Sequence, residues 1–581
     1  MENMAPAMPP RRLLRLTLLS AVVGLAGGGA AYCLVHLIGL LTNLLLFQRS
    51  GWTIPSLRDF HPGPWLYLVT VGGAMIVAIF AKWAPVIKGH GLPEAMEAVL
   101  TKQSKVSPRT AIAKPLSSAV AIGSGGPFGA EGPIIVTGGA IGSLLGQLVH
   151  VSPNERKILL ASGAAAGMAA TFGSPLAAVI LAIELLLFEF STRAFIPLVV
   201  AAAVAGGVHS ALFGSGPLFT PPHHAFTGLG QLPLFVLLGG LCGILAVIIT
   251  KGLFITEHLY RKLPVSEFWH PAIGAIVFAT VGLVVPRALG VGYDAIDDVL
   301  AGRLALGTLG ALALAKLIAW WFALGSGTSG GTLAPILLVS VAVGGTLGEL
   351  ASRMLPGAHL SPGAFALVAM AATFGAATRA PFASIVFVFE LTRDYNAILP
   401  LMIATVIATL LATVLMQDSI MTEKLTRRGL HVPSDYHVDL LVTVRVDQVM
   451  TRDVVVLDST LSVEEGVRKF HSGHHGAYPV VDADGRCVGI LGRGDLLHGD
   501  LADDQTLGDV AAREIVAIKP GDTVAVALQT MVEEGVDHLP VLDADGALVG
   551  ICTRGDILAA RRSHLSVDRV QHGWRPGRLS A

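Results

Sequence analysis

Two glycine-rich segments carry the residues whose chemistry stands out. GSGGPFGAEGPIIVTGGAIGSLLG begins at Gly123, and GSGTSGGTLAPILLVSVAVGGTLG begins at Gly325. In each segment, glycines stand directly before a predicted helix start. Helix N-termini present unpaired N–H groups and about half a positive charge, so they bind anions without a cationic side chain. Both segments therefore predict anion binding by backbone amides.

The charges in these segments favour an anion over a cation. Residues 123–135 contain one charged residue, Glu131, and residues 325–337 contain none. A cation pathway is expected to display several carboxylates, whereas dipoles without fixed charge suit an anion that must leave again. Glu131 is an ionisable residue within an apolar region, which predicts a functional role. Its carboxylate could occupy an anion site and vacate it on protonation; alternatively, it only complements the helix dipole.

The two segments belong to an internal repeat. The residues with an identical partner 202 positions later are Gly123, Ser124, Gly125, Pro133, Ile134, Gly142, Leu145 and Gly146. AATFG recurs with the same offset, and Glu184 matches Glu390 after a four-residue insertion. Paired, Gly/Pro-interrupted segments in two halves point to a transport site. Close helix packing explains many of the glycines, but not the duplicated loop and helix start. We expect Glu184 and Glu390 to be structural.

Composition divides the chain into a membrane part and a soluble part. Hydrophobic residues make up 53% and charged residues 14% of the 581 residues, with a mean hydropathy of +0.67. Residues 441–581 hold 35 of the 81 charges, so the first 440 residues hold only 46. A single soluble enzyme and a disordered chain are therefore excluded. A net charge of −1 gives no field that indicates nucleic acid, and the four cysteines lack CxxC spacing for a metal.

The first part predicts an all-α, polytopic membrane domain. Its apolar runs are 17–47, 66–87, 155–190, 195–213, 230–257, 269–286, 304–324, 333–352, 363–391 and 397–416. Several are long enough to cross ~30 Å of hydrocarbon, and those with Gly and Pro clusters predict short, tilted or broken helices. Arg11, Arg12 and Arg15 precede the first run. They predict an uncleaved first helix, a cytoplasmic N-terminus at residues 1–14 and a bacterial-type inner or plasma membrane location.

Three motifs resemble those of the CLC family of chloride channels and chloride/proton antiporters. They are GHGLP at 89–93, similar to GxGxP, GAEGP at 129–133, similar to GREGP, and GGTLAP at 330–335, similar to GGxFAP. The resemblance covers about residues 15–430, with halves at about 15–215 and 225–416. It implies two inverted repeats of tilted and broken helices. It also implies a homodimer with a separate pore for chloride or other small anions in each subunit.

The resemblance implies a set of site residues. Glu131 stands at the outer gate, and His90 stands where many members have a serine that contacts the central anion; the alternative is a histidine that only caps a loop. The backbone amides of Thr332 and Leu333 stand where the family binds the same ion. The remaining anion-site positions are Gly89, Gly91, Leu92, Pro93, Gly129, Ala130, Gly132, Pro133, Gly331, Ala334 and Met421.

Several positions depart from the family pattern. Ala130 replaces the common arginine, Leu333 replaces phenylalanine, and Met421 cannot donate the hydrogen bond of the usual tyrosine. His90 and Met421 leave the selectivity of chloride over nitrate open, and signatures of fluoride-selective members are absent. Leu185 stands where antiporters often carry an internal proton-transfer glutamate. We therefore slightly favour a channel over a chloride/proton antiporter, although other protonatable groups or water can relay protons.

A second repeat, with an offset of 61 residues, marks the soluble part. YPVVDADGRCVGILGRGDLL at 478–497 matches HLPVLDADGALVGICTRGDIL at 538–558. Each copy predicts a strand, a DADG hairpin turn, a strand and a helix. Further helices are predicted at 461–473 and 523–535. This α/β pattern resembles a tandem CBS pair, with domains at 443–500 and 507–563 and a polar tail at 564–581.

The CBS resemblance implies a possible adenine-nucleotide site for ATP, ADP or AMP, although no cofactor is required. Thr553 would supply a hydroxyl for phosphate, and Asp556 would supply a carboxylate for ribose. The first copy has Gly492 before Asp495, so it lacks the hydroxyl. The alternative is a purely structural dimerisation module. Neither the DADG spacing nor the histidines His471, His474 and His475 predict a metal site.

Three other functions account for the sequence less well. A CBS-containing cation transporter, for example for magnesium, should line its pore with acidic residues. An intramembrane metalloprotease needs HExxH, and the chain contains no His-Glu dipeptide. A passive scaffold needs no duplicated loops. The sequence therefore predicts a CLC-type anion transport protein, not an enzyme, that is gated by Glu131 and regulated by a cytoplasmic CBS pair.

Overall fold

The structure is a computed structural model, and contacts within it divide the chain into two units. The described residues are 9–220, 231–430, 441, 444–473, 475–492, 495, 505–511 and 515–559. One unit is Pro10–Tyr436, and the other comprises His437–Ala581 with the first nine residues. The predicted polar tail 564–581, His474 and most of the predicted N-terminal segment lie outside the described residues.

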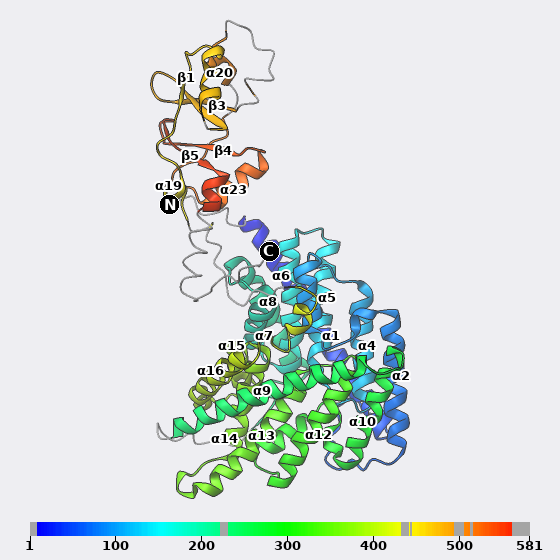
Figure 1. Ribbon diagram of the computed structural model, residues 1–581. Helices are drawn as coiled ribbons and strands as arrows, with labels where there is room; N and C mark the ends of the chain where they lie inside the picture. The colour runs from blue at the N-terminus through cyan, green and yellow to red at the C-terminus, as the bar shows by residue number, and fades with distance from the viewer. Residues whose placement is uncertain are drawn as a thin grey trace. The chain divides into compact units, whose positions relative to one another are not determined.

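The first unit consists of helices that recur in the same order in two halves (Figure 1). The first half contains α1 (Pro10–Leu46), α2 (Trp65–Trp83), α3 (Leu92–Thr101), α4 (Pro108–Gly123), α5 (Glu131–Leu148), α6 (Pro153–Phe172), α7 (Pro175–Ala182) and α8 (Thr192–Leu212). The second half contains α9 (Leu232–Arg261), α10 (His270–Val284), α11 (Tyr293–Leu300), α12 (Leu306–Gly325), α13 (Leu333–Met354), α14 (Pro362–Thr378), α15 (Pro381–Thr392) and α16 (Ile398–Leu415), followed by α17 (Glu423–Thr426). This order matches the repeat in the sequence.

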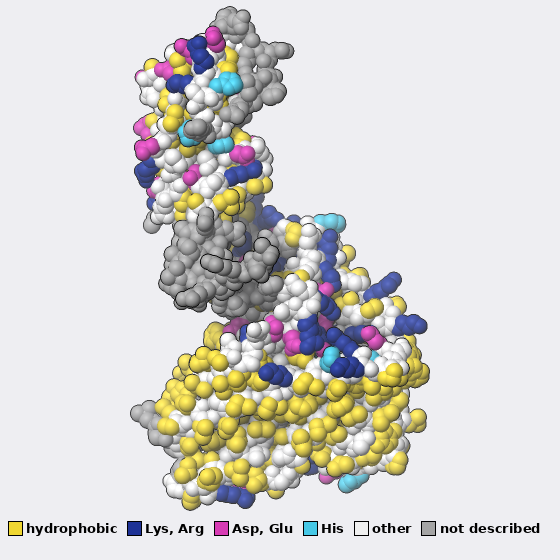
Figure 2. Space-filling model, in the orientation of Figure 1, with side chains coloured by type: hydrophobic (Ala, Val, Ile, Leu, Met, Phe, Trp, Pro, Cys, Tyr) yellow, Lys and Arg dark blue, Asp and Glu magenta, His cyan; other side chains and the backbone are white. Residues whose placement is uncertain are grey.

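The surface of this unit suits a bilayer. Among the described residues, eight helices are long and apolar enough to cross a membrane. Figure 2 shows hydrophobic side chains over most of the face in view, whereas Lys and Arg gather along one edge of the unit. Because lipid provides no hydrogen bonds, an apolar surface around helices is the form expected of a membrane domain.

The long apolar runs are broken where the sequence places proline. The run 155–190 contains two helices, α6 and α7, with Pro175 at the start of α7 and a turn of π-helix at Ile183–Leu187. The run 363–391 divides in the same way, with Pro381 at the start of α15. Proline has no N–H to donate and favours the first turn of a helix. The prediction of short, broken helices is therefore confirmed for both runs.

The first helix starts earlier than its hydrophobicity predicts. α1 begins at Pro10, so Arg11, Arg12 and Arg15 lie within its first turns rather than in a preceding segment. Arg12 Nε donates to Glu155 Oε1 over 2.6 Å, at the start of α6. The ion pair with Glu155 stabilises the polar first turns of α1. The sequence of residues 10–16 alone does not predict this contact.

Glu184 and Glu390 join the two halves by capping each other's helices. Glu184 Oε2 accepts a hydrogen bond of 3.0 Å from the amide of Ala383, in the first turn of α15. Glu390 accepts from the amides of Leu176 and Ala177, in the first turn of α7, over 3.1 and 2.7 Å. Carboxylates stabilise helix N-termini. The contacts are those of a structural pair, as the symmetry of the repeat predicts.

Glycine allows α5 and α6 to pack closely. A Cβ atom on Gly163 would lie 2.0 Å from the carbonyl oxygen of Gly138, and one on Gly138 would lie 2.1 Å from that of Gly163. Small residues at such crossings let two backbones approach in a membrane. α5 therefore depends on α6 for its position.

The soluble unit contains two interleaved copies of one motif. The first sheet has the order β1-β2-β3, and the second pairs β4 with β5. The elements are α19 (Val446–Val449), β1 (Leu457–Asp458), α20 (Val463–Ser472), β2 (Ala477–Val481), β3 (Cys487–Gly492), α22 (Leu507–Ala511), α23 (Val524–Glu533), β4 (His538–Leu542) and β5 (Leu548–Thr553). The antiparallel pairs β2–β3 and β4–β5 each carry a register shift at the same repeat position. The predicted α/β architecture is confirmed.

The cores of the two copies exchange their first helices. Val446 of α19 packs with Leu539 in the core of the second copy, whereas Leu507 of α22 packs with Leu457 and Phe470 in the core of the first copy. Neither copy therefore completes its core without the other.

We predict that Gly163→Ala destabilises the membrane unit. Its new methyl group would overlap the backbone of α5, and overpacking of this kind costs about 1–3 kcal/mol. Gly207→Ala, on α8, is the control, because a Cβ atom there meets no atom within 4 Å. Thermal unfolding of the purified protein in detergent should show a lower midpoint for Gly163→Ala only. Equal midpoints would contradict the proposed close packing.

Candidate anion site

Three backbone segments meet at the helix starts predicted to bind anions. The amide of Gly331 donates to the carbonyl of Gly129 over 3.0 Å, and these two glycines occupy the same position in the two repeats. Gly89 forms a bridge with Ser329. The loops at 89–93, 129–133 and 330–335 are thus brought together, as the resemblance implies.

The approach of these segments requires glycine at several predicted positions. A Cβ atom on Gly132 would lie 2.2 Å from the carbonyl oxygen of His90, and one on Gly91 would lie 2.7 Å from that of Gly132. Gly89 and Gly91 both have φ of +98°, a conformation that side chains disfavour. The glycines therefore fix the distance between the loop at 89–93 and the start of α5.

Helix N-termini from both halves point at this junction. α5 begins at Glu131 and contains Gly132 and Pro133 in its first turn. α13 begins at Leu333 and continues through Ala334, with Thr332 directly before it. α3 begins at Leu92 and Pro93. Unpaired N–H groups at such termini offer sites for an anion.

Glu131 is buried at the centre of the junction. Its Oε1 accepts a hydrogen bond of 2.9 Å from the hydroxyl of Tyr293, whereas Oε2 has no hydrogen-bond partner within the described part of the chain. A Cβ atom on Gly129 would lie 1.6 Å from Oε2, and one on Gly331 would lie 2.7 Å from it. The carboxylate therefore lies against the paired glycines, where it occupies space that an anion would need.

Two buried lysines hold the loops on either side of Glu131. Lys114 Nζ donates to the carbonyls of Ile87 and Gly89, both over 2.8 Å, and Lys316 Nζ donates to the carbonyl of Gly290 over 2.6 Å. The two lysines stand 202 residues apart, so they are equivalent in the repeat. Neither lysine is predicted as a site residue above, although the offset of 202 residues relates them.

The side chain of His90 is buried at the junction. It is 1% exposed, and neither of its ring nitrogens has a hydrogen-bond partner in the residues that the structure describes. Buried polar atoms usually find partners. Of the two roles considered for His90, contact with a ligand fits this side chain better than the capping of a loop, because a capping side chain would have a hydrogen-bond partner.

A second charged group approaches the loop from α17. Lys424 Nζ would lie 3.1 Å from a Cβ atom on Gly89, and it pairs with Glu257 Oε1 over 3.0 Å. Met421 is buried three residues before Lys424, and its role at the anion stays a prediction. Leu185 is buried in the π-helical turn, so no carboxylate occupies the position of the internal proton-transfer glutamate. Ala130 is also buried, directly before α5.

Tyr293 contacts Glu131 but is not among the residues that the sequence patterns predict. It is the first residue of α11, and its counterpart in the first half is Leu92 at the start of α3. Because the repeat does not preserve its type, no pattern marks it. Only the fold brings it to Glu131.

The predicted nucleotide residues of the CBS pair form a helix cap. Thr553 Oγ1 donates to Asp556 Oδ2 over 2.7 Å, and the amide of Asp556 donates to Thr553 Oγ1 over 3.2 Å. Thr506 and Asp509 form the same pair of hydrogen bonds, which lowers the pKa of the Asp509 carboxyl. Asp495 accepts from the amide of Gly492 over 2.8 Å. The nucleotide role of Thr553 and Asp556 stays a prediction.

Comparison with protein families agrees with this geometry. The chain matches the voltage gated chloride channel family over residues 72–413 and the CBS domain over residues 446–501 and 507–563. It is 32% identical over 422 residues to the H(+)/Cl(−) exchange transporter ClcA of Vibrio campbellii (strain ATCC BAA-1116), a match that covers 70% of this chain and 88% of that protein. It is 28% identical over 560 residues to chloride channel protein CLC-f of Arabidopsis thaliana, with coverage of 82% and 70%.

Solved structures show the same fold. A slow cyanobacterial Cl−/H+ antiporter superimposes with a TM-score of 0.63 at 25% identity, over 73% of this chain and 99% of that one. A eukaryotic CLC transporter superimposes with a TM-score of 0.60 at 21% identity, over 94% and 98%. The membrane unit has the CLC fold, and the soluble unit carries a CBS pair. The chain therefore belongs to the voltage gated chloride channel family, CLC, as a multi-pass membrane protein that transports anions and is not an enzyme.

Proposed function

We propose that this protein exchanges chloride for protons across the membrane. Membership of the CLC family favours anion transport over the two alternatives considered above, a cation transporter and a metalloprotease. Within the family, the relatives named exchange transporters and the antiporter structure favour exchange over the channel mode that Leu185 suggests. We therefore favour an exchanger over the channel expected from the sequence. Leu185 alone does not exclude a proton route through other groups.

The observation that carries the proposal is the position of Glu131. Its carboxylate lies against Gly129 and Gly331, at the N-termini of α5 and α13. An anion attracted by those termini and the charged carboxylate compete for the same space. A proton that neutralises the carboxylate favours its departure, so the binding of a proton and the admission of chloride are linked at one group.

The inner part of the path must work without a carboxylate at Leu185. The two ring nitrogens of His90 have no hydrogen-bond partner among the described residues, and one of them can donate a hydrogen bond to chloride in the neutral ring. We assign His90 to the central anion site. Lys114 and Lys316 are buried on the two sides of the junction, where they donate hydrogen bonds to loop carbonyls.

The remaining assignments concern assembly and orientation. We propose that the protein is a homodimer with one pore in each subunit, as the resemblance to the CLC family implies. We place the N-terminus and the CBS pair on the cytoplasmic side, because Arg11, Arg12 and Arg15 at the first helix and Arg427 and Arg428 after the last follow the positive-inside rule.

We predict that Glu131→Ala uncouples the two ions. Purified protein in liposomes with an imposed chloride gradient should drive protons uphill, as measured by a chloride electrode and external pH. In Glu131→Ala, chloride efflux should persist and become independent of pH, whereas proton movement should cease. Efflux without proton movement in the unaltered protein would identify a channel and refute exchange.

We predict that Gly129→Ala expels the gate from its site. The added methyl group would overlap Glu131 Oε2, and the end of a flexible side chain moves more easily than a backbone. Chloride flux at alkaline pH should rise toward that of Glu131→Ala. Addition of Gly129→Ala to Glu131→Ala should change nothing further. A low, pH-dependent flux in Gly129→Ala would show that the carboxylate does not block the site.

We further propose that the CBS pair binds an adenine nucleotide at Thr553 and Asp556. Isothermal titration calorimetry with ATP and AMP should show one site per chain. Thr553→Ala should weaken it at least tenfold, since a hydrogen bond to charged phosphate is lost. Thr506→Ala is the control, because it removes the same cap from another helix. Equal affinity in both variants, or none in the unaltered protein, would support a structural dimerisation module instead.

A further inference from the structure

Tyr293 contacts the gate from outside the three family loops. Its hydroxyl donates to Glu131 Oε1 over 2.9 Å, across a sequence separation of 162 residues. Its ring packs edge-on against Phe172, with ring centroids 6.2 Å apart, and against Phe219, at 6.3 Å. The aromatic contacts fix the ring, so the hydroxyl is aimed at the carboxylate.

Hydrogen bonds of neighbouring residues hold the chain in place before and after Tyr293. Before it, the carbonyl of Gly290 accepts from Lys316 Nζ, and the amide of Gly290 donates to the carbonyl of Gly125 over 3.2 Å. After it, Asp294 Oδ2 accepts from Ser56 Oγ over 2.7 Å and from the amide of Leu57 over 3.2 Å. A donor held in this way loses little freedom when it binds the carboxylate.

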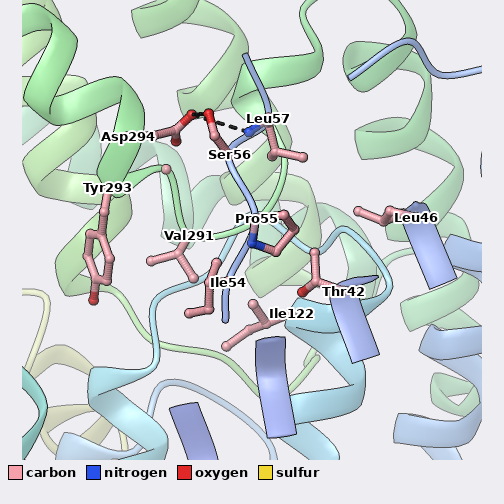
Figure 3. Close-up of a pocket in the computed structure, with 12 residues that line it drawn as sticks. Thr42, Leu46, Ile54, Pro55, Ser56, Leu57, Ile122, Val291, Tyr293 and Asp294 are labelled. Atoms are coloured by element: carbon pink, nitrogen blue, oxygen red, sulfur yellow. Dashed lines mark hydrogen bonds between the residues drawn. The ribbon is translucent and has the colours of Figure 1, made fainter. Parts of the chain in front are cut away.

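Tyr293 also lies at the end of a cavity. A cavity of about 200 Å³ is lined by residues of the segment before α2, by Gly290–Asp294 and by side chains of α1 and α4. Figure 3 shows Asp294 and Ser56 joined at one side of it, whereas the hydroxyl of Tyr293 points away from them. Tyr293 therefore lines this cavity and also contacts Glu131.

We propose that Tyr293 is a latch that holds Glu131 in its closed position against the paired glycines. The proposal rests on the gating role of Glu131. In the closed position, the hydroxyl stabilises the charged carboxylate by a charge-assisted hydrogen bond. When the carboxylate leaves or is protonated, that bond weakens or breaks. The latch thus sets how readily the gate opens, and it is absent from the first half of the repeat, where Leu92 cannot donate.

The charged groups around the gate do not duplicate the latch. Tyr293 donates to the Glu131 carboxylate and Lys316 lies near enough to act on its charge, and the amides of Glu131 and Ala334 also face the carboxylate. Lys316 Nζ is committed to the carbonyl of Gly290. The hydroxyl of Tyr293 is therefore the side-chain donor that a single substitution can remove from the gate.

The test is Tyr293→Phe, which removes the hydroxyl and keeps the ring. Chloride flux from liposomes is measured between acidic and alkaline pH. A hydrogen bond to a charged group changes an equilibrium on the order of tenfold. Flux at alkaline pH should therefore rise on the order of tenfold. The pH of half-maximal flux should move upward by about one unit, because the charged, closed form loses its donor.

Two controls separate a latch from a packing role. Tyr67→Phe removes a hydroxyl that pairs with Thr280 Oγ1 over 2.9 Å elsewhere in the membrane unit, and it should leave flux unchanged. Tyr293→Phe should have no effect in Glu131→Ala, because the latch acts only through the carboxylate. Unchanged or lower flux in Tyr293→Phe, or an equal effect in both backgrounds, would overturn the proposal. If Glu131→Ala itself keeps its pH dependence, the gating role fails rather than the latch alone.

Discussion

The backbone pairing of Gly129 with Gly331 is the contact on which the site depends. It joins the same position of two repeats, so it places the N-termini of α5 and α13 at one point. Two helix termini can then attract one anion with no cationic side chain in contact with it. The pairing also leaves room for the carboxylate of Glu131, which a side chain at either glycine would displace.

The rest of the membrane unit serves this junction. The crossing of α5 and α6 at Gly138 and Gly163 holds one helix start, and the mutual caps of Glu184 and Glu390 hold the two halves together. The carboxylate caps satisfy backbone N–H groups at the starts of α7 and α15 inside an apolar domain. In hydrocarbon, unpaired groups would be costly. The breaks before α7 and α15 are therefore stabilised by a carboxylate from the other half.

Much of the site follows from the sequence because duplication leaves a record. The offset of 202 residues marks the two glycine loops and the helix starts that follow them, and it also relates Lys114 to Lys316. Glu131 has Leu333 at the equivalent position, so its charge within an apolar region marks it instead. The π-helical turn around Leu185 and the early start of α1 leave no such record. Both depend on partners far away in the chain, which composition and periodicity do not contain.

Tyr293 is not predicted from the repeat for a different reason. Its role comes from a difference between the repeats, and a search for similarity discards differences. The choice between channel and exchanger is equally hard to predict from the repeat. A single residue such as Leu185 removes one possible proton carrier but leaves the architecture unchanged. Relatives therefore inform that choice more than any pattern within the chain.

The buried lysines have a consequence for the energetics of the path. Lys114 and Lys316 are both fully buried, and each is bonded to backbone carbonyls. Dissolved salt screens exposed charges over about 8 Å at physiological ionic strength, but it does not enter a closed protein interior. The attraction that these lysines and the helix termini exert at the junction is therefore screened far less by dissolved salt than that of charges on the surface.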